Sequence, residues 1–328
     1  MDKIKYIDLF CGVGGFRVAI TNAAKRNGFK AECVFSSDID LECQKQYFHN
    51  FKELPVGDIT KVIAQEIPDH DVLLAGFPCQ PFSIIGYRKG FEDTRGTLFF
   101  EIARIIDAKK PKIFILENVK LLAGHNGGKT LQKIISTLNG LGYKVDYKIL
   151  NALDFGLPQK RERIFLVGFH KGCDFSWPDK SMKLRPLSAI LESDVPERYF
   201  ASDRIRKSRL KHHKPTTEPT IWHENKAGNI SVHPFSCALR AGASYNYLLV
   251  NGERRLTPRE MFRLQGFPDS YKLISTDYQL RKQAGNSLPV PVAEAVIFEA
   301  IKAMFISQYP YNLEGLTIDG QFALFEKK

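Results

Sequence analysis

A cysteine flanked by prolines follows a short apolar run in the first third of the chain. The segment DVLLAGFPCQPFS, residues 71–83, places Cys79 between Pro78 and Pro81. Because neither neighbourhood can continue a helix, this cysteine lies in a loop, where a thiolate can act as a nucleophile. A free thiol has a pKa of about 8.5, so an active Cys79 needs a base or a positive charge nearby. On this segment alone, a purely structural loop cysteine remains the alternative.

Two other segments offer partners for such a cysteine. Glu117 and Asn118 end the apolar run IFILENV, and Arg161 and Arg163 come just before the run IFLVGF. A carboxylate on so apolar a strand is costly to bury unless it is bonded or protonated. Alternate residues of an extended segment share a face, so both guanidiniums could point at one ligand. A helix cap for Glu117 and a solvated basic turn for the arginines are the alternative interpretations.

A glycine-rich turn near the start of the chain predicts a cofactor site. The sequence FCGVGGF, residues 10–16, joins an apolar run to a helical pattern, and its glycines let a ligand approach the backbone closely. Asp38 follows the next apolar run and is placed to bond ribose hydroxyls. We therefore expect an adenosine-containing cofactor, although a structural turn would also account for the glycines. The Gly-x-Gly-Gly spacing speaks against a pyrophosphate ligand such as NAD or ATP.

Short apolar runs alternate with amphipathic stretches in the first half, which predicts an α/β fold with a parallel sheet covered on both faces. The expected strands are 5–10, 32–37, 71–75, 112–116, 143–151 and 164–169, and the expected helices are 16–27, 40–51, 98–109 and 130–141. Near residue 171 this alternation of apolar runs and amphipathic stretches ends, so we expect a second, smaller domain that is mainly irregular or β. Residues 291–306 have the pattern of a helix that returns to the first domain.

Composition limits the class of protein. The 328 residues are 44% hydrophobic, and 47 Lys plus Arg against 36 Asp plus Glu give a net charge of +11. These values exclude a disordered chain, a collagen-like fibre and a coiled coil. No run of about 18 apolar residues is present to span a bilayer. Six scattered cysteines fit a reducing cytoplasm without structural zinc, and we expect no metal.

The charge is concentrated in the second half and suggests a polyanionic partner. Residues 181–269 hold 15 Lys plus Arg and 9 Asp plus Glu, more than half of the surplus. Six basic residues without an acid among them fall in eleven positions: Arg204, Arg206, Lys207, Arg209, Lys211 and Lys214. A strip of this kind can contact nucleic-acid phosphates, with an affinity that falls steeply with salt. A solvated basic loop is the alternative.

Taken in order, these motifs closely resemble those of the cytosine-C5 DNA methyltransferases, particularly the compact bacterial modification enzymes. The motifs are FxGxGG from Phe10, GDI from Gly57, GFPCQPFS from Gly76, ENV from Glu117, QxRxR from Gln159, RLTPRE from Arg255 and GNS from Gly285. The resemblance covers roughly residues 4–300 and leaves only about 171–254 without a motif. It implies a Rossmann-like S-adenosylmethionine-dependent methyltransferase sheet over 1–180 and 270–328, with a smaller target-recognition domain over 181–269.

The resemblance also implies the reaction. An S-adenosyl-L-methionine methyl group would pass to C5 of a cytosine extruded from a short specific sequence of double-stranded DNA, leaving S-adenosyl-L-homocysteine. Cys79 would attack C6 of the base, Glu117 would contact N3 and the exocyclic amine, and Arg163 would hold O2. The residues that support the cysteine loop would be Pro78, Asn118 and Arg161.

By the same pattern, the cofactor would be bound by Phe10, Gly12, Gly14, Gly15, Asp38, Ile39, Asp58, Ile59 and Asn286. The residues that contact DNA would be Gln80, Ser83, Arg204, Arg206, Lys207, Arg209 and Arg240. The implied setting is a bacterial restriction–modification system, in which a cognate endonuclease acts on the same sequence without a stable complex. We expect a monomer in the cytoplasm, associated with the nucleoid through DNA and not with a membrane.

The chain departs from the family pattern at two places, and three other interpretations of its motifs are open. The family's recognition Thr followed by Leu, Val or Ile is matched best by Ala238-Leu239, and its ribose-binding Glu by Asp38. A tRNA cytosine methyltransferase would typically carry Cys-Phe-Thr where this chain has Phe235-Ser-Cys-Ala. A non-catalytic DNA-binding relative would have lost the cysteine or the ENV motif. A dehydrogenase would explain the glycine loop alone.

Overall fold

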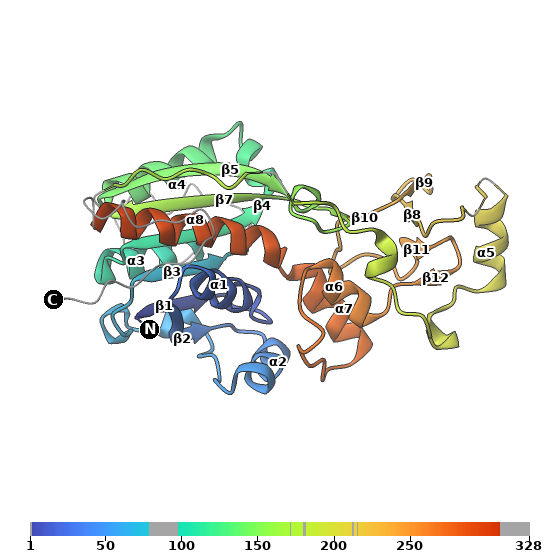
Figure 1. Cartoon of the computed structure of the whole chain (residues 1–328), viewed down its shortest axis with the longest axis horizontal. Helices are drawn as coiled ribbons and strands as arrows, with labels where there is room; N and C mark the ends of the chain where they lie inside the picture. Colours follow the sequence, from blue (N-terminus) through green and yellow to red (C-terminus); the bar gives the residue numbers. More distant parts are fainter. Residues whose placement is uncertain are drawn as a thin grey trace.

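The structure is a computed structural model that describes residues 2–78, 98–170, 172–179, 182–211, 213–214 and 216–308. A six-stranded sheet with the order β2-β1-β3-β4-β7-β5 forms its larger part (Figure 1). Its strands are β1 Lys3–Leu9, β2 Lys30–Ser37, β3 Val72–Gly76, β4 Ile113–Val119, β5 Tyr143–Asn151 and β7 Glu162–His170. The central strands β3 and β4 are buried on both faces, as their continuous apolar runs predict.

The α/β fold class is confirmed, but the expectation of a parallel sheet was wrong for one strand. Strand β7 runs antiparallel to both of its neighbours, β4 and β5. Antiparallel neighbours need only a short connection, whereas parallel neighbours need a crossover. Between Asn151 and Glu162 the chain forms only a short 3₁₀ helix, Ala152–Asp154, and the two-residue strand β6, Gln159–Lys160. The absence of a helical pattern between these two runs was the signal in the sequence.

Helices cover both faces of the sheet, and each face has its own apolar core. Helices α1 (Gly15–Arg26) and α8 (Val290–Gln308) pack against each other on one face. Helices α3 (Leu98–Lys109) and α4 (Lys129–Gly140) cover the other face. The fifth predicted helix is α2 (Leu41–Phe51), and all five begin and end within two residues of the expected positions. Within the described part of the chain, no helix is long and apolar enough to cross a membrane.

A smaller sheet lies at the far end of the molecule (Figure 1). Its order is β12-β11-β8-β9, and the strands are β8 Ile221–Glu224, β9 Ile230–His233, β11 Leu248–Val250 and β12 Arg254–Arg255. The prediction of β structure in this region is confirmed. The helix α5 (Asp203–Leu210) was not expected, because Arg209 is its only buried residue and it therefore has no apolar stripe in the sequence.

Two further connections join the small sheet to the large one. Strand β10 (Ser236–Cys237) pairs in parallel with β6, and the helices α6 (Pro258–Leu264) and α7 (Asp277–Asn286) lie between the two sheets (Figure 1). The remaining short helices are 3₁₀ turns at Ile59–Lys61, Ala64–Glu66, Lys120–Gly124, Leu187–Ala189 and Glu197–Tyr199. The RLTPRE motif starts α6 as a capping box, in which Thr257 and Glu260 bond each other's backbone N–H groups.

The strand order places a binding crevice between β1 and β3. The chain passes from β1 to β2 on one side and reaches β3 on the other side of β1. In open α/β sheets, ligands bind outside the carboxyl ends of the strands at such a switch point. The glycine loop follows β1, and Phe77 and Pro78 follow β3. The two motifs that the sequence singled out separately therefore flank one crevice.

Candidate active site

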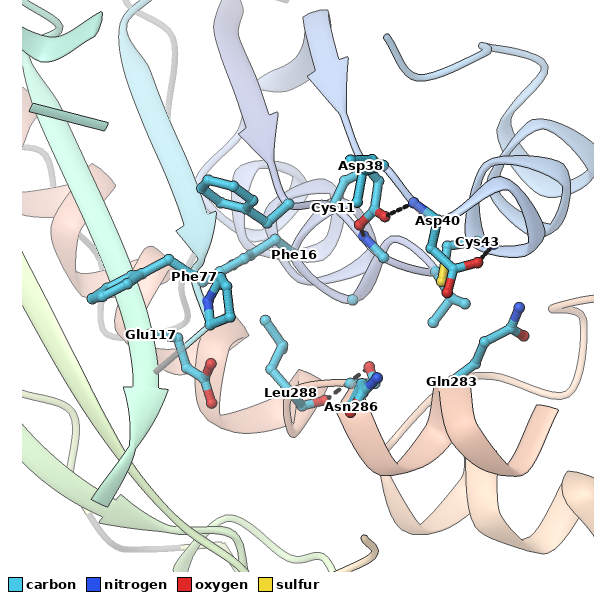
Figure 2. A pocket seen from close by; sticks show the side chains of 18 of the residues that line it. Cys11, Phe16, Asp38, Asp40, Cys43, Phe77, Glu117, Gln283, Asn286 and Leu288 are labelled. Atoms are coloured by element: carbon cyan, nitrogen blue, oxygen red, sulfur yellow. Dashed lines mark hydrogen bonds between the residues drawn. The ribbon is translucent and has the colours of Figure 1, made fainter. Parts of the chain in front are cut away.

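A cavity of about 570 Å³ opens at this edge of the sheet (Figure 2). It brings together most of the residues predicted to bind a cofactor or to act on a substrate: Phe10, Gly12, Gly15, Asp38, Ile39, Asp58, Ile59, Pro78, Glu117, Asn118, Arg161, Arg163 and Asn286. Figure 2 shows Glu117 at one end of the cavity and Asp38 and Asp40 at the other. Cys79, Gln80 and Ser83 lie outside the described residues.

The glycine loop at one end of the cavity is fixed by its own backbone. Gly14 has a φ of +82° and precedes the first turn of α1. A side chain at this position would collide with the ring of Phe51. Unlike the other predicted cofactor residues, Gly14 does not line the cavity. It acts instead on the shape of the loop, because L-residues with side chains adopt this conformation only at a cost.

Asp38 holds the glycine loop against the start of α2. Its Oδ2 accepts a hydrogen bond from the backbone N–H of Gly12 at 2.7 Å, and its Oδ1 accepts one from Asp40 at 2.8 Å. Burial raises the pKa of Asp38, and the two backbone N–H groups act in the opposite direction. The carboxylate predicted to bind a ribose therefore also positions the loop that lines the cavity.

The rim of this end carries one carboxylate and two apolar side chains. Asp58 caps a short 3₁₀ helix by accepting hydrogen bonds from the N–H and the hydroxyl of Thr60. These bonds lower the pKa of Asp58, so it is ionised at neutral pH. Ile39 is 73% exposed and lines the cavity together with Ile59. This arrangement can take a flat ring between apolar side chains and a polar edge.

The C-terminal elements close the cavity from the opposite side. On α7, Lys282 forms an ion pair of 2.8 Å with Asp40, and Gln283 donates a hydrogen bond to the carbonyl of Glu42. Asn286 is exposed on this wall, and Leu288 lines the cavity beside it. In the sequence, only the GNS motif pointed to this wall. The contributions of Gln283 and Leu288 were missed because they depend on how α7 packs.

At the other end of the cavity, a carboxyl group and a guanidinium face each other. Glu117 lies near the carboxyl end of β4, where it pairs with Gly76 at the end of β3, and its Oε1 lies 3.0 Å from Nε of Arg163 on β7. Both side chains are nearly buried, at 12% and 13% exposure. Burial raises the pKa of Glu117, although Arg163 and Arg161 act in the opposite direction. Among the described residues, no helix N–H donates to Glu117, and burial favours its protonated form.

Asn118 fixes the entry to the cysteine loop. Its side-chain nitrogen donates a hydrogen bond of 3.0 Å to the carbonyl of Phe77, and its oxygen accepts one of 2.8 Å from Val119. Asn118 is 2% exposed, so both bonds are shielded from water. The residue that follows Phe77 is Pro78, which lines the cavity. The predicted supporting role of Asn118 thus corresponds to a direct contact with the segment that leads to Cys79.

The two arginines of the QxRxR motif differ in what they bind, contrary to the expectation that both could face one ligand. Arg161 is 1% exposed, and its guanidinium donates to three backbone carbonyls, those of Leu239 at 2.9 Å, Gly285 at 3.0 Å and Ser287 at 2.5 Å. Burial lowers the pKa of Arg161. Although Arg161 touches the cavity, both of its terminal nitrogens are committed to the protein backbone. The guanidinium that faces the carboxyl group is that of Arg163.

Gln159 also binds the segment that follows β10, and this role was not predicted from the sequence. Its side-chain oxygen accepts a hydrogen bond from the N–H of Leu239 at 3.0 Å, and its nitrogen donates to the carbonyl of Leu264 at 2.8 Å. Gln159 is fully buried. Together with Arg161, it fixes the segment that follows β10 against the wall of the cavity.

The basic strip on α5 is only partly available to a ligand. Arg204 and Lys207 are exposed, and Arg206 pairs with Asp203 one turn earlier. Arg209, in contrast, is 4% exposed and pairs with Glu224 at 2.7 Å. The expectation that Arg209 contacts DNA is therefore corrected, because its charge is used within the protein.

Comparisons with known proteins agree with this geometry. The sequence model of the family described as C-5 cytosine-specific DNA methylase matches residues 4–303. The chain is 54% identical over 296 residues to the Type II methyltransferase M.NgoBI of Neisseria gonorrhoeae, covering 89% of this chain and 91% of the relative. It is 53% identical over 307 residues to M.HaeII of Haemophilus aegyptius, covering 93% and 95%.

A solved structure shares the fold. A mutant of DNMT2 from Spodoptera frugiperda is 20% identical to this chain and superposes with a TM-score of 0.69, covering 92% of this chain and 99% of the other. The family match spans most of the chain, and the two bacterial relatives are more than half identical to it. The chain therefore belongs to the C-5 cytosine-specific DNA methylases and is a DNA cytosine-5 methyltransferase.

Proposed function

We propose that this enzyme transfers the methyl group of S-adenosyl-L-methionine to C5 of a cytosine that is extruded from a short specific DNA duplex. The proposal includes a covalent bond between Cys79 and C6 of the base, and a role as the modification enzyme of a restriction–modification system. One observation carries it most directly. The Glu117–Arg163 pair lies in the same cavity as the glycine loop, so a base and an adenosine cofactor can meet there.

The cofactor end of the cavity has groups that suit S-adenosyl-L-methionine. The first turn of α1 has no side-chain cap, and its residues Gly15 and Phe16 line the cavity. Free N–H groups at a helix N-terminus favour a carboxylate such as that of the methionine portion. Asp58 and Ile59 would hold the adenine, and Asp38 the ribose. When bound, this cofactor supplies a methyl group on a positively charged sulfur.

Glu117 and Arg163 provide the groups that a cytosine needs at its Watson–Crick edge. A protonated Glu117 donates to N3, and its other oxygen accepts from the exocyclic amine. Arg163 donates to O2, which lies on the other side of N3 in the ring. The raised pKa of Glu117 supports this assignment, because general-acid work at neutral pH requires a carboxyl group that keeps its proton.

The covalent step follows from the chemistry of the ring. The Cys79 thiolate forms a bond to C6, and the electron pair of the C5–C6 double bond becomes available at C5 as N3 takes the proton from Glu117. C5 would then take the methyl group, whose bond to the cofactor's sulfur breaks and leaves S-adenosyl-L-homocysteine. A base removes the C5 proton, the double bond forms again, and Cys79 leaves as a thiolate. Asn118 supports the step indirectly, by holding Phe77 at the start of the cysteine loop.

Residues 181–269 would form the target-recognition domain, and residues 1–180 with 270–328 the catalytic domain. The exposed Arg204 and Lys207 would contact phosphates, while Gln80 and Ser83 would meet the DNA close to the extruded base. The enzyme would act as a monomer in the cytoplasm, associated with the nucleoid through DNA. A cognate endonuclease would cut the same sequence when it is unmethylated, without forming a stable complex.

The test is transfer of a labelled methyl group to unmethylated duplex DNA and, in parallel, to tRNA, followed by bisulfite sequencing of the DNA. We expect label in DNA and protected cytosines in one short sequence context. Label in tRNA alone would keep the chemistry and contradict the substrate. Label in neither would contradict the proposed activity altogether.

A further inference from the structure

Arg240 is held at the wall of the active-site cavity by its backbone. It follows Leu239, whose N–H and carbonyl are bonded by Gln159 and Arg161. On the other side, a side chain at Gly285 would collide with the backbone between Arg240 and Ala241, so the two segments are packed closely. Arg161 and Gly285 both line the cavity. The position of Arg240 is therefore fixed relative to the site that receives the base.

The side chain of Arg240 is exposed but held in place by an aromatic ring. Its guanidinium carbon lies 4.8 Å from the centre of the Tyr247 ring, and the hydroxyl of Tyr247 accepts a hydrogen bond from the N–H of Arg240 at 3.0 Å. Within the part of the chain that the structure describes, no carboxylate lies within 4 Å of this guanidinium. Its side chain is thus exposed and lies against an aromatic ring, with no acidic partner among the described residues.

Two histidines on the small sheet lie near this arginine. His223 of β8 and His233 of β9 belong to strands that pair with each other. The ring of His223 packs edge-on against that of Tyr247, with centroids 6.3 Å apart, and Tyr247 is also the ring that Arg240 contacts. His233 stacks on Phe235 and lies 3.0 Å from the hydroxyl of Ser231. This surface offers hydrogen-bond donors near Arg240, which has no carboxylate within ion-pair distance among the residues that the structure describes.

From this arrangement we infer that Arg240 reads a guanine of the target sequence in the major groove, close to the extruded cytosine. The inference rests on the proposed function and names one base of its substrate. A guanidinium presents two parallel N–H groups, and guanine presents two acceptors, N7 and O6, side by side in the major groove. A contact with a phosphate would need the charge alone, whereas the backbone of Arg240 is held on both sides and its side chain lies against the Tyr247 ring.

The experiment uses duplexes that carry the sequence found by bisulfite sequencing. Each guanine is replaced in turn by 7-deazaguanine, which lacks N7, or by inosine, which keeps N7 and O6 and loses only the minor-groove amine. We expect one 7-deazaguanine position to weaken binding of the wild-type enzyme about tenfold, and inosine there to have little effect. Arg240→Ala should lose the effect at that position and should methylate duplexes with another base pair there.

Arg198→Ala is the matched control. Arg198 also lies 4.8 Å from a tyrosine ring, that of Tyr199, but it has an acidic partner in Asp277. This variant should keep the sequence preference of the wild type. Arg240→Lys keeps the charge and loses the paired N–H groups, so it should relax the preference at the same position as Arg240→Ala.

Two results would overturn the inference alone. One is that Arg240→Ala binds all sequences more weakly by the same factor, with a salt dependence of binding reduced by about one ion, and that Arg240→Lys restores both properties. That pattern marks a phosphate contact. The other is an unchanged sequence preference in Arg240→Ala. The absence of methylated cytosine in every DNA context would instead overturn the proposed function, and this inference with it.

Discussion

The two ends of the active-site cavity are built in different ways. At the cofactor end, the contacts are between backbone N–H groups and short acidic side chains, such as Asp38 with Gly12 and Asp40. At the base end, they join distant parts of the chain, such as Arg161 with Leu239 and Gly285. The cofactor end therefore depends mainly on the loops that follow β1 and β2, with α7 packed against them. The base end depends on the large sheet, the recognition segment and α7 being packed together.

The largest expected effect is at the base end. Glu117→Gln should slow methyl transfer by roughly 10²- to 10⁴-fold, because an amide cannot give a proton to N3. Binding of S-adenosyl-L-methionine, measured by calorimetry, should be nearly unchanged because Glu117 lies at the opposite end of the cavity (Figure 2). Glu162→Gln is the control, since Glu162 pairs with Lys120 near the surface. If Glu117→Gln methylated DNA at the wild-type rate, the role proposed for Glu117 at the base end of the cavity would be wrong.

Glu117→Gln should also change how the methyl-transfer rate depends on pH. The pKa of Glu117 is raised by burial, so its neutral form, which is the proton donor, persists to higher pH than that of an ordinary glutamate. The single-turnover rate of the wild type should therefore fall as the pH rises through this pKa. The falling limb should be missing in Glu117→Gln. A fall of the same steepness in both enzymes would assign the titration to another group.

The next largest effects should differ between substitutions of Arg161 and of Arg163. Arg161→Met should lower the free energy of unfolding by about 3 kcal/mol or more, because three buried carbonyls lose their donor. Arg163→Met should cost about 1 kcal/mol, since the Glu117 that it leaves can stay protonated, but it should still lower the methyl-transfer rate. Urea unfolding of both variants measures the difference. The opposite order of stability would contradict the roles assigned here.

At the cofactor end, Gly14→Ala should cost about 1–3 kcal/mol of stability and weaken cofactor binding. The backbone of Gly14 has a φ of +82°, and an added methyl group would meet Phe51. Gly140→Ala is the matched control, because Gly140 ends α4 with nothing within 4 Å of an added methyl group. It should be neutral or slightly stabilising. Equal effects of the two substitutions in thermal unfolding would contradict the importance of the loop conformation.

The smallest expected effect is at the rim. Asp58→Asn should raise the Kd for S-adenosyl-L-methionine by only about two- to tenfold, because an exposed hydrogen bond contributes little. The asparagine can still cap the short helix through its oxygen, so folding should be unaffected. Asp69→Asn removes another exposed aspartate, one that pairs with Lys109 away from the cavity. A change in Kd as large for Asp69→Asn as for Asp58→Asn would show that the rim carboxylate has no specific role.

The difference between the two ends of the cavity also explains which features of the fold and of the site could be predicted from the sequence. The strands and helices of the large sheet were found because each is a continuous apolar run or an amphipathic stretch. The glycine loop and Asp38 were found because each directly follows an apolar run and consists of residue types that suit a cofactor site. Strand β7 was given the wrong direction because the run 164–169 does not itself show its direction, which the missing helical pattern between residues 151 and 162 indicates instead.

The roles of the basic residues could not be predicted in the same way. Arg161 and Arg163 share one motif, yet one binds backbone carbonyls from two distant segments and the other faces Glu117. Arg209 belongs to a basic run, but the fold brings Glu224 next to it. In each case the partner is set by long-range packing, which residue types and spacing do not determine. Helix α5 was missed because its buried face consists of this one arginine.

The central claim is that this cavity holds a cytosine while Cys79 bonds to its C6. The most direct measurement uses duplex DNA with 5-fluorocytosine at the target position, incubated with the enzyme and S-adenosyl-L-methionine. Fluorine at C5 cannot leave as a proton does, so we expect a stable adduct that mass spectrometry assigns to the peptide containing Cys79. Cys79→Ser should give no adduct. The absence of any adduct in the wild-type enzyme, on a sequence that it methylates normally, would contradict the account.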